Sequence, residues 1–108
     1  MNKYNNIKTV IDGISFASKR EATRYSELKL LERGKCISDL RLQVPYVLIE
    51  SQKGGIRKEL PMKYIADYVY WDIEQEAEII EDVKGMKTDV YKIKRKLMKQ
   101  MGYEITEV

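Results

Sequence analysis

The feature that most constrains the fold is a pair of β-strand patterns, each of which carries an acidic residue among apolar ones. Residues 64–70 and 79–85 are rich in β-branched and aromatic side chains and are bounded by turn-forming residues. Side chains alternate along a strand, so Asp67 and Asp82 are both predicted to lie on apolar faces, with Lys84 following on the face of Asp82. A buried charge without a partner is costly, so these side chains require each other or a bound cation.

The first of these strands carries apolar or aromatic residues on both faces. Asp67 shares its face with Ile65, Val69 and Trp71. The other face carries a file of aromatic residues: Tyr64, Tyr68 and Tyr70. These rings could stack on nucleic-acid bases, but packing between strands is the preferred interpretation.

The composition restricts the available chemistry. The chain of 108 residues is expected to form one domain, residues 1–108, around a single modest core. It contains no histidine, which excludes Ser-His-Asp and Cys-His nucleophile systems and most zinc sites. The single cysteine, Cys36, excludes an internal disulfide and fits a reducing cytoplasm. No apolar run approaches the ~20 residues of a membrane helix, so no membrane partner is expected.

Charge is distributed unevenly along the second half of the chain. Residues 72–82 contain six acids and no base: Asp72, Glu74, Glu76, Glu78, Glu81 and Asp82. Residues 84–99 contain seven bases and one acid, Asp89. An acidic pocket for a metal beside a basic surface for phosphate is one interpretation. A solvated surface would explain either cluster by itself.

Residues 18–33 are predicted to form a helix that has Gly34 as its C′ residue. On a helical wheel, Glu21 lies at the centre of the apolar stripe, which consists of Ala22, Tyr25, Leu28 and Leu31. Two interpretations of Glu21 stay open. It completes a capping box with Ser18, or it is a third carboxylate of the acidic site.

The remaining segments supply further strands. Residues 8–16 form a predicted hairpin around an Asp-Gly turn. Residues 42–49 form a strand in which Pro45 indicates an edge or a bulge, and turns account for the polarity of Asp39 and Gln43. An exposed hairpin loop is expected at residues 50–58, and a tight link between strands at residues 74–76. Residues 103–108 are expected to form a closing strand.

A second helix is predicted to start at a cap formed by Thr88 or Asp89 and to end near Met101. Its expected buried stripe is Val90, Ile93, Leu97 and Met101. Its opposite side gathers Lys92, Arg95, Lys96 and Lys99, which are either solvated or lie along a nucleic-acid backbone. The element order gives an α/β or α+β fold, with a central mixed β-sheet flanked by two helices.

A carboxylate followed about fifteen residues later by an acid-x-Lys triplet resembles the PD-(D/E)XK nuclease superfamily. The match is to small phage proteins similar to Holliday-junction resolvases. Asp67 and the triplet Asp82-Val83-Lys84 carry the resemblance, with Ala66 where the family name has Pro. It extends from about Phe16 to the end of the chain and implies a restriction-endonuclease-like core.

The resemblance also implies a site and its chemistry. Asp67 and Asp82 would bind Mg²⁺ or Mn²⁺, with the carbonyl of Val83 as a further ligand. Glu21 matches the helix-one acid that completes the metal site in many members. Lys84 would orient or activate the attacking water. The catalytic residues would thus be Asp67, Asp82, Lys84 and Glu21.

The implied function is that of a metal-dependent, structure-specific DNA endonuclease of phage origin, resembling a Holliday-junction resolvase and acting in the cytoplasm of a bacterial host. A homodimer is expected, since a chain this short has no separate specificity domain. The residues expected to contact DNA are Lys87, Lys92, Arg95, Lys96 and Lys99. The alternative is a non-catalytic DNA-binding or phage accessory protein that retains the fold.

Overall fold

The computed structural model describes residues 8–51, 60–83 and 87–108. Lys84 of the predicted site and most of the predicted loop at residues 50–58 therefore lie outside the described residues. The elements are β1 (Thr9–Ile11), β2 (Ile14–Phe16), α1 (Lys19–Arg33), β3 (Ile37–Ile49), β4 (Met62–Asp72), β5 (Ala77–Asp82), α2 (Asp89–Gln100) and β6 (Ile105–Glu107). In the described part of the chain, no helix is long and apolar enough to cross a membrane.

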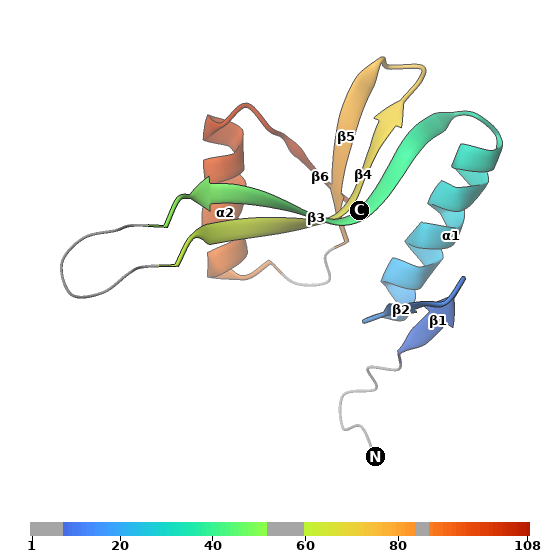
Figure 1. Ribbon diagram of the computed structural model, residues 1–108, viewed down its shortest axis with the longest axis horizontal. Coiled ribbons are helices and arrows are strands. Elements are labelled where there is room, and N and C mark those ends of the chain that lie inside the picture. Colours follow the sequence, from blue (N-terminus) through green and yellow to red (C-terminus); the bar gives the residue numbers. More distant parts are fainter. Residues whose placement is uncertain (1–7, 52–59, 84–86) are drawn as a thin grey trace.

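The fold is α+β, and the predicted mixed sheet between two helices is confirmed. The four-stranded sheet has the order β3-β4-β5-β6, in which β6 pairs parallel to β5 and the other pairs are antiparallel. The helices α1 and α2 lie to either side of the sheet, and the hairpin of β1 and β2 packs at the start of α1 (Figure 1). The predicted edge position of Pro45 is confirmed, because Pro45 lies in β3 at the edge of the sheet.

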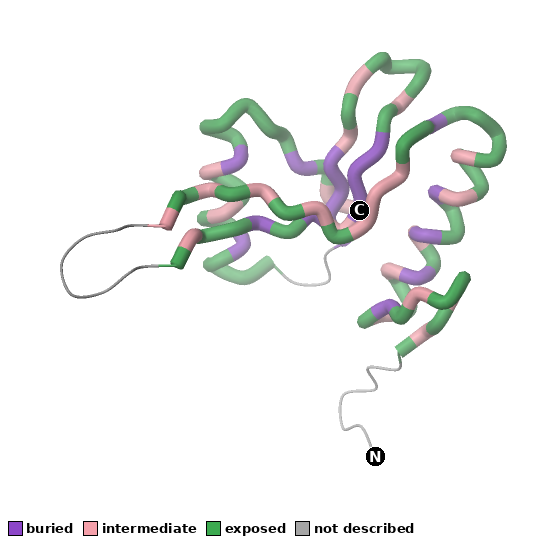
Figure 2. The backbone as a smooth tube through the Cα atoms, in the orientation of Figure 1, coloured by how far each residue is buried: buried purple, intermediate pink, exposed green. Residues whose placement is uncertain are grey.

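Two hydrophobic clusters fill the spaces between the sheet and the helices. One joins α1 to the sheet through Tyr25, Leu28 and Tyr68, and the other joins α2 through Tyr91 and Met98. The buried residues gather where the strands cross and on the inner sides of the helices (Figure 2). Since β5 lies between the two clusters, its alternate side chains serve both: Ile79 packs against the α1 cluster, and Ile80 belongs to the α2 cluster.

In the long hairpin of β3 and β4, the side chains switch from one hydrophobic cluster to the other at Gln43 and Asp67. Leu42 belongs to the α1 cluster, whereas Val44, two residues along, belongs to the α2 cluster. Regular alternation would keep these two side chains on one face. Gln43 has a φ of 52°, in the left-handed region that non-glycine residues seldom adopt. The facing residues of β4 change cluster in the same way around Asp67.

This change corrects the predicted environment of Asp67. Val69 is buried, but Ile65 and Trp71 are 52% and 42% exposed, so the expected apolar face of these three residues does not form. The physical reason is the break in alternation, which separates Ile65 from Val69. The tyrosines Tyr64, Tyr68 and Tyr70 are buried, which confirms the packing interpretation over base stacking.

The helix α1 follows its prediction closely. The side chain of Ser18 caps it by accepting the N–H of Glu21 at 3.1 Å, and its buried residues are Ala22, Tyr25 and Leu28. Two details were predicted wrongly. Leu31 was placed on the apolar stripe but is exposed, and Gly34 is not the left-handed residue that ends the helix. Gly34 has a φ of −77°, and Lys35 takes the left-handed conformation instead, because the N–H groups of Lys35 and Cys36 close the last turn.

The helix α2 begins at the predicted cap, Thr88, but buries a different face. Tyr91 and Met98 are buried, whereas Val90, Ile93 and Met101 of the predicted stripe are exposed. Each buried residue lies one position after a predicted one, so the buried face is rotated by roughly 100° around the helix axis. The side chain of Tyr91 donates a hydrogen bond to the Oε2 of Glu107 at 2.7 Å, and this contact with β6 holds the helix in the rotated position.

Alanine substitutions at two positions of α2 should distinguish the observed buried face from the predicted one. Met98→Ala should lower the free energy of unfolding by about 2–5 kcal/mol, because it opens a cavity in the α2 cluster. The matched variant Ile93→Ala removes an exposed side chain and should change stability by ~0.5 kcal/mol or less. Urea denaturation followed by circular dichroism measures both, and the opposite ranking would restore the predicted stripe.

Candidate functional site

Asp67 and Asp82 come together where β4 and β5 meet. The register of these strands pairs Tyr68 with Glu81, which places Asp67 opposite Asp82 one step further along the same antiparallel ladder. The backbone N–H of Val83 donates to the Oδ2 of Asp67 at 2.8 Å. The structure therefore joins the two acids that the sequence pattern predicted to form one site.

The surroundings of Asp67 oppose its ionisation. The pKa of its carboxyl group is raised from 3.8 to about 6, and burial is the largest cause. The charges of Asp82 and Glu21 and a hydrogen bond with Asp82 act in the same direction, while the hydrogen bond from Val83 lowers the pKa. A strongly perturbed acid beside another acid is typical of a site that uses these groups.

Two polar side chains that were not predicted to belong to the site orient the acids. The hydroxyl of Tyr64 donates to the Oδ2 of Asp82 at 2.6 Å, and both groups are buried. Burial and this contact raise the pKa of Tyr64 strongly, so its hydroxyl stays a donor. On the other side, the Nε2 of Gln43 lies 3.4 Å from the Oδ1 of Asp67. The polarity of Gln43 thus reflects a contact with the site, not a turn.

A hollow of about 290 Å³ opens beside the acids. Besides Asp67 and Asp82, its lining includes Lys63 and Tyr64 from β4 and Lys94 and Tyr91 from α2. The N-cap residue Thr88 also lines it. The hollow therefore combines two carboxylates with two ammonium groups, between the sheet and the first turns of α2.

Glu81, the neighbour of Asp82, faces the opposite side of β5. Its carboxylate accepts hydrogen bonds from the Nε and Nη2 of Arg24 at 2.8 and 2.5 Å and another from the hydroxyl of Tyr70. It is 1% exposed, and the pair raises the pKa of Arg24. Of the two adjacent acids, Asp82 therefore lines the hollow, and Glu81 joins α1 to the sheet.

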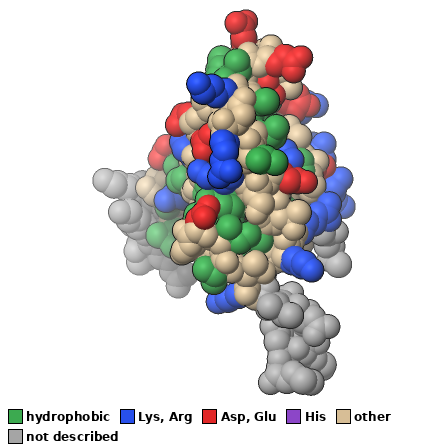
Figure 3. Space-filling view, turned by 90° about the vertical axis from the view of Figure 1, so that its right-hand side faces the viewer, with side chains coloured by type: hydrophobic (Ala, Val, Ile, Leu, Met, Phe, Trp, Pro, Cys, Tyr) green, Lys and Arg blue, Asp and Glu red, His purple; other side chains and the backbone are tan. Residues whose placement is uncertain are grey.

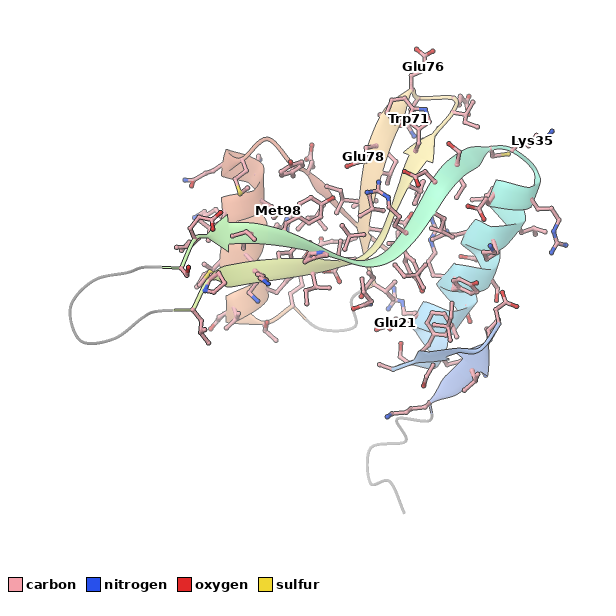
Figure 4. The ribbon with its side chains drawn as sticks, in the orientation of Figure 1. Glu21, Lys35, Trp71, Glu76, Glu78 and Met98 are labelled. Carbon is pink, nitrogen blue, oxygen red and sulfur yellow. The ribbon has the colours of Figure 1, made fainter. Side chains whose placement is uncertain are left out.

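Glu21 lies on the side of α1 that faces the sheet (Figure 4). Its backbone carbonyl accepts the hydroxyl of Tyr68 at 2.7 Å, and its charge contributes to the raised pKa of Asp67. The Ser18 half of the capping box is confirmed, so both interpretations of Glu21 stand. Within the described residues, no three acidic or cysteine side chains are arranged to hold a metal, so Glu21 stays a predicted ligand.

The clusters of charge differ from the predicted acidic pocket and basic surface. Acidic side chains gather at the end of the β4–β5 hairpin, away from the hollow (Figures 3 and 4): Asp72, Glu74, Glu76 and Glu78. On the basic side, Lys87 and Arg95 contact Glu107 at 3.1 and 3.8 Å. Lys92, Lys96 and Lys99 line a hollow of about 220 Å³ with Arg95, and their contact with DNA stays a prediction.

The sequence of the chain matches a known protein family. Residues 1–107 match the family described as "Protein of unknown function (DUF1064)", and the chain belongs to this family. No curated protein and no solved structure matches it. The arguments about the site therefore depend on its own residues.

The raised pKa of Asp67 predicts a dependence of stability on pH. An acid with a folded-state pKa above its unfolded value stabilises the fold at low pH, and this contribution is lost as the pH rises through the folded value. Asp67→Asn should thus have little effect near pH 4 and should raise the melting temperature above pH 6. The Asn oxygen still accepts the N–H of Val83.

Thermal melts at both pH values measure this difference. Glu104→Gln, which removes an exposed carboxylate outside the hollow, serves as the control. An equal effect of Asp67→Asn at both pH values would contradict the assigned environment.

Proposed function

We propose that this member of the DUF1064 family is a metal-dependent endonuclease that acts on DNA. The observation that supports the proposal is the pair Asp67 and Asp82, which share a hollow with two lysines. Two carboxylates forced together, one of them with a raised pKa, attract a divalent cation because it neutralises both charges. The proposal adopts the activity implied by the resemblance to PD-(D/E)XK nucleases.

The oxygen atoms at this site fit a hard cation such as Mg²⁺ or Mn²⁺. Asp67 and Asp82 would hold it, with the predicted help of the Val83 carbonyl and of Glu21. A bound Mg²⁺ supplies Lewis-acid polarisation of a phosphoryl oxygen and lowers the pKa of a bound water. Lys84, which follows Val83 in the sequence, is the proposed group that orients this water.

The surrounding groups prepare the two carboxylates for this task. Tyr64 fixes one oxygen of Asp82, and the N–H of Val83 fixes one oxygen of Asp67. Ligands held in place before binding pay less entropy when the cation arrives. Below its raised pKa, Asp67 must release a proton before it can act as a ligand, so activity should increase as the pH rises through about 6.

The proposal extends to the partners that the resemblance implies. These are branched or duplex DNA, a second copy of the chain in a homodimer, and a phage context in the cytoplasm of a bacterial host. The competing function is a DNA-binding or phage accessory protein without catalysis. A protein that only binds DNA gains nothing from two neighbouring carboxylates, one buried and one half-buried, because they repel phosphate and destabilise the fold.

Cleavage of supercoiled plasmid in Mg²⁺ or Mn²⁺ tests the proposal. We expect metal-dependent nicking by the wild type and its loss in Asp82→Asn. Glu78→Gln, which removes an exposed acid from the same strand, should cleave normally. Metal should also raise the melting temperature of the wild type but not that of Asp82→Asn, since a ligand that binds only the folded state stabilises it.

Plasmid, linear duplex and branched substrates are to be compared. If none is cut in either metal while the protein still binds DNA, the non-catalytic alternative is correct.

The two interpretations of Glu21 predict different effects of its substitution on cleavage. Glu21→Gln keeps a hydrogen-bond acceptor for the capping box but loses the carboxylate. It should leave the melting temperature without metal unchanged or higher, and should reduce cleavage by at least about tenfold, equivalent to ~1.4 kcal/mol of transition-state stabilisation. Ser18→Ala should cost roughly 1 kcal/mol of stability and keep most of the cleavage activity. Wild-type cleavage by Glu21→Gln would make Glu21 a capping residue only.

A further inference from the structure

The hollow beside the acids also contains two cationic groups without an assigned role. Lys63 lies four residues before Asp67 on β4, and Lys94 lies one helical turn after Tyr91 on α2. Across the described ranges 8–51, 60–83 and 87–108, neither lysine forms an ion pair with an acidic side chain. Both ammonium groups are therefore available to a ligand that enters the hollow.

Other basic residues around the site are already engaged. Arg24 is bound by the buried Glu81, and Lys87 and Arg95 share Glu107. These contacts stabilise the packing of α1 and of α2. Lys63 and Lys94 instead line the space that the acids face.

The rotation of α2 brings Lys94 to this position. Lys94 is about 60° from the buried Tyr91 around the helix, at 100° per residue, and it is half-buried. Lys96, two residues further along, is about 140° from Tyr91 and exposed, on the side predicted to contact DNA. Lys35 is exposed in the turn between α1 and β3, outside the hollow, so it serves as the control for both lysines.

We propose that Lys63 and Lys94 form a phosphate-binding subsite, which takes a phosphodiester group of a nucleic-acid strand next to the acid pair. This inference rests on the proposed function. Two carboxylates would repel a phosphate, and two ammonium groups offset that charge. A divalent cation then gives the hollow a net positive charge, which attracts the anionic substrate. Lysine suits this role because its compact charge binds phosphate without a fixed geometry.

Binding of a fluorescein-labelled DNA duplex tests the subsite apart from cleavage. Affinity is measured over a range of salt concentrations without divalent cations, in the Asp82→Asn background, where hydrolysis plays no part. Adding Lys94→Gln or Lys63→Gln should weaken binding and reduce the slope of log K against log salt by about 0.9 for each lost duplex contact. In the wild-type background with Mg²⁺, the same substitutions should slow cleavage, whereas Lys35→Gln should leave cleavage by saturating DNA unchanged.

Several outcomes would overturn the subsite. One is an unchanged salt slope in both Lys94→Gln and Lys63→Gln. Another is an equal loss in Lys35→Gln, which would indicate a general effect of the protein's charge. Stabilisation of the wild type by inorganic phosphate, lost in Lys94→Gln while DNA binding is kept, would assign the hollow to a small phosphate compound instead.

The subsite and the proposed function can fail independently. A wild type that never cleaves, combined with a reduced slope in Lys94→Gln, would retain the subsite and reject the nuclease. A wild type that cleaves, with no effect of Lys94→Gln or Lys63→Gln, would do the reverse. A fall in melting temperature without any change in slope would mark the lysines as structural and would also overturn the proposal.

Discussion

The ion pair between Glu81 and Arg24 determines how the centre of this molecule is arranged. The carboxylate is buried in β5 and receives three hydrogen bonds, from two nitrogen atoms of Arg24 and from the hydroxyl of Tyr70. A buried charge is tolerated only with such partners, so Glu81 must face α1. Since side chains alternate along a strand, Asp82 must then face the other way, into the hollow. The same pair holds α1 against the sheet, and α1 brings Glu21 near Asp67.

Local patterns were sufficient to predict the elements. The strands around Asp67 and Asp82, the hairpin with Asp12 and Gly13 at its turn, and the cap at Ser18 depend on neighbouring residues, and all are confirmed. The resemblance also predicted that Asp67 and Asp82 lie in one site, and the antiparallel register of β4 and β5 brings the two residues together.

Contacts between distant residues were not accessible in this way. The rotation of α2 depends on a hydrogen bond from Tyr91 to Glu107, and a helical wheel drawn from α2 alone contains no sign of it. The change of facing at Gln43 depends on a left-handed residue inside a strand, which glycine-based rules do not anticipate. Tyr64 and Arg24 were missed because an aromatic residue in a strand and a basic residue on a helix are common in any fold. Only the position of their partners gives them a role.

Two features that the sequence did not predict, the break at Gln43 and the rotation of α2, both shape the hollow. The break at Gln43 and Asp67 removes Ile65 from the face of Val69, so Ile65 is exposed and lines the hollow. The rotation of α2 turns Tyr91 inward and carries Lys94 to the rim of the same hollow, while Val90 and Ile93 become exposed. Burying all four apolar residues of the predicted stripe would have given a more regular helix–sheet contact. It would also have turned Lys94 away from the hollow, which would then hold the two acids beside Lys63 alone among the lysines that the structure describes, and would attract an anion less strongly.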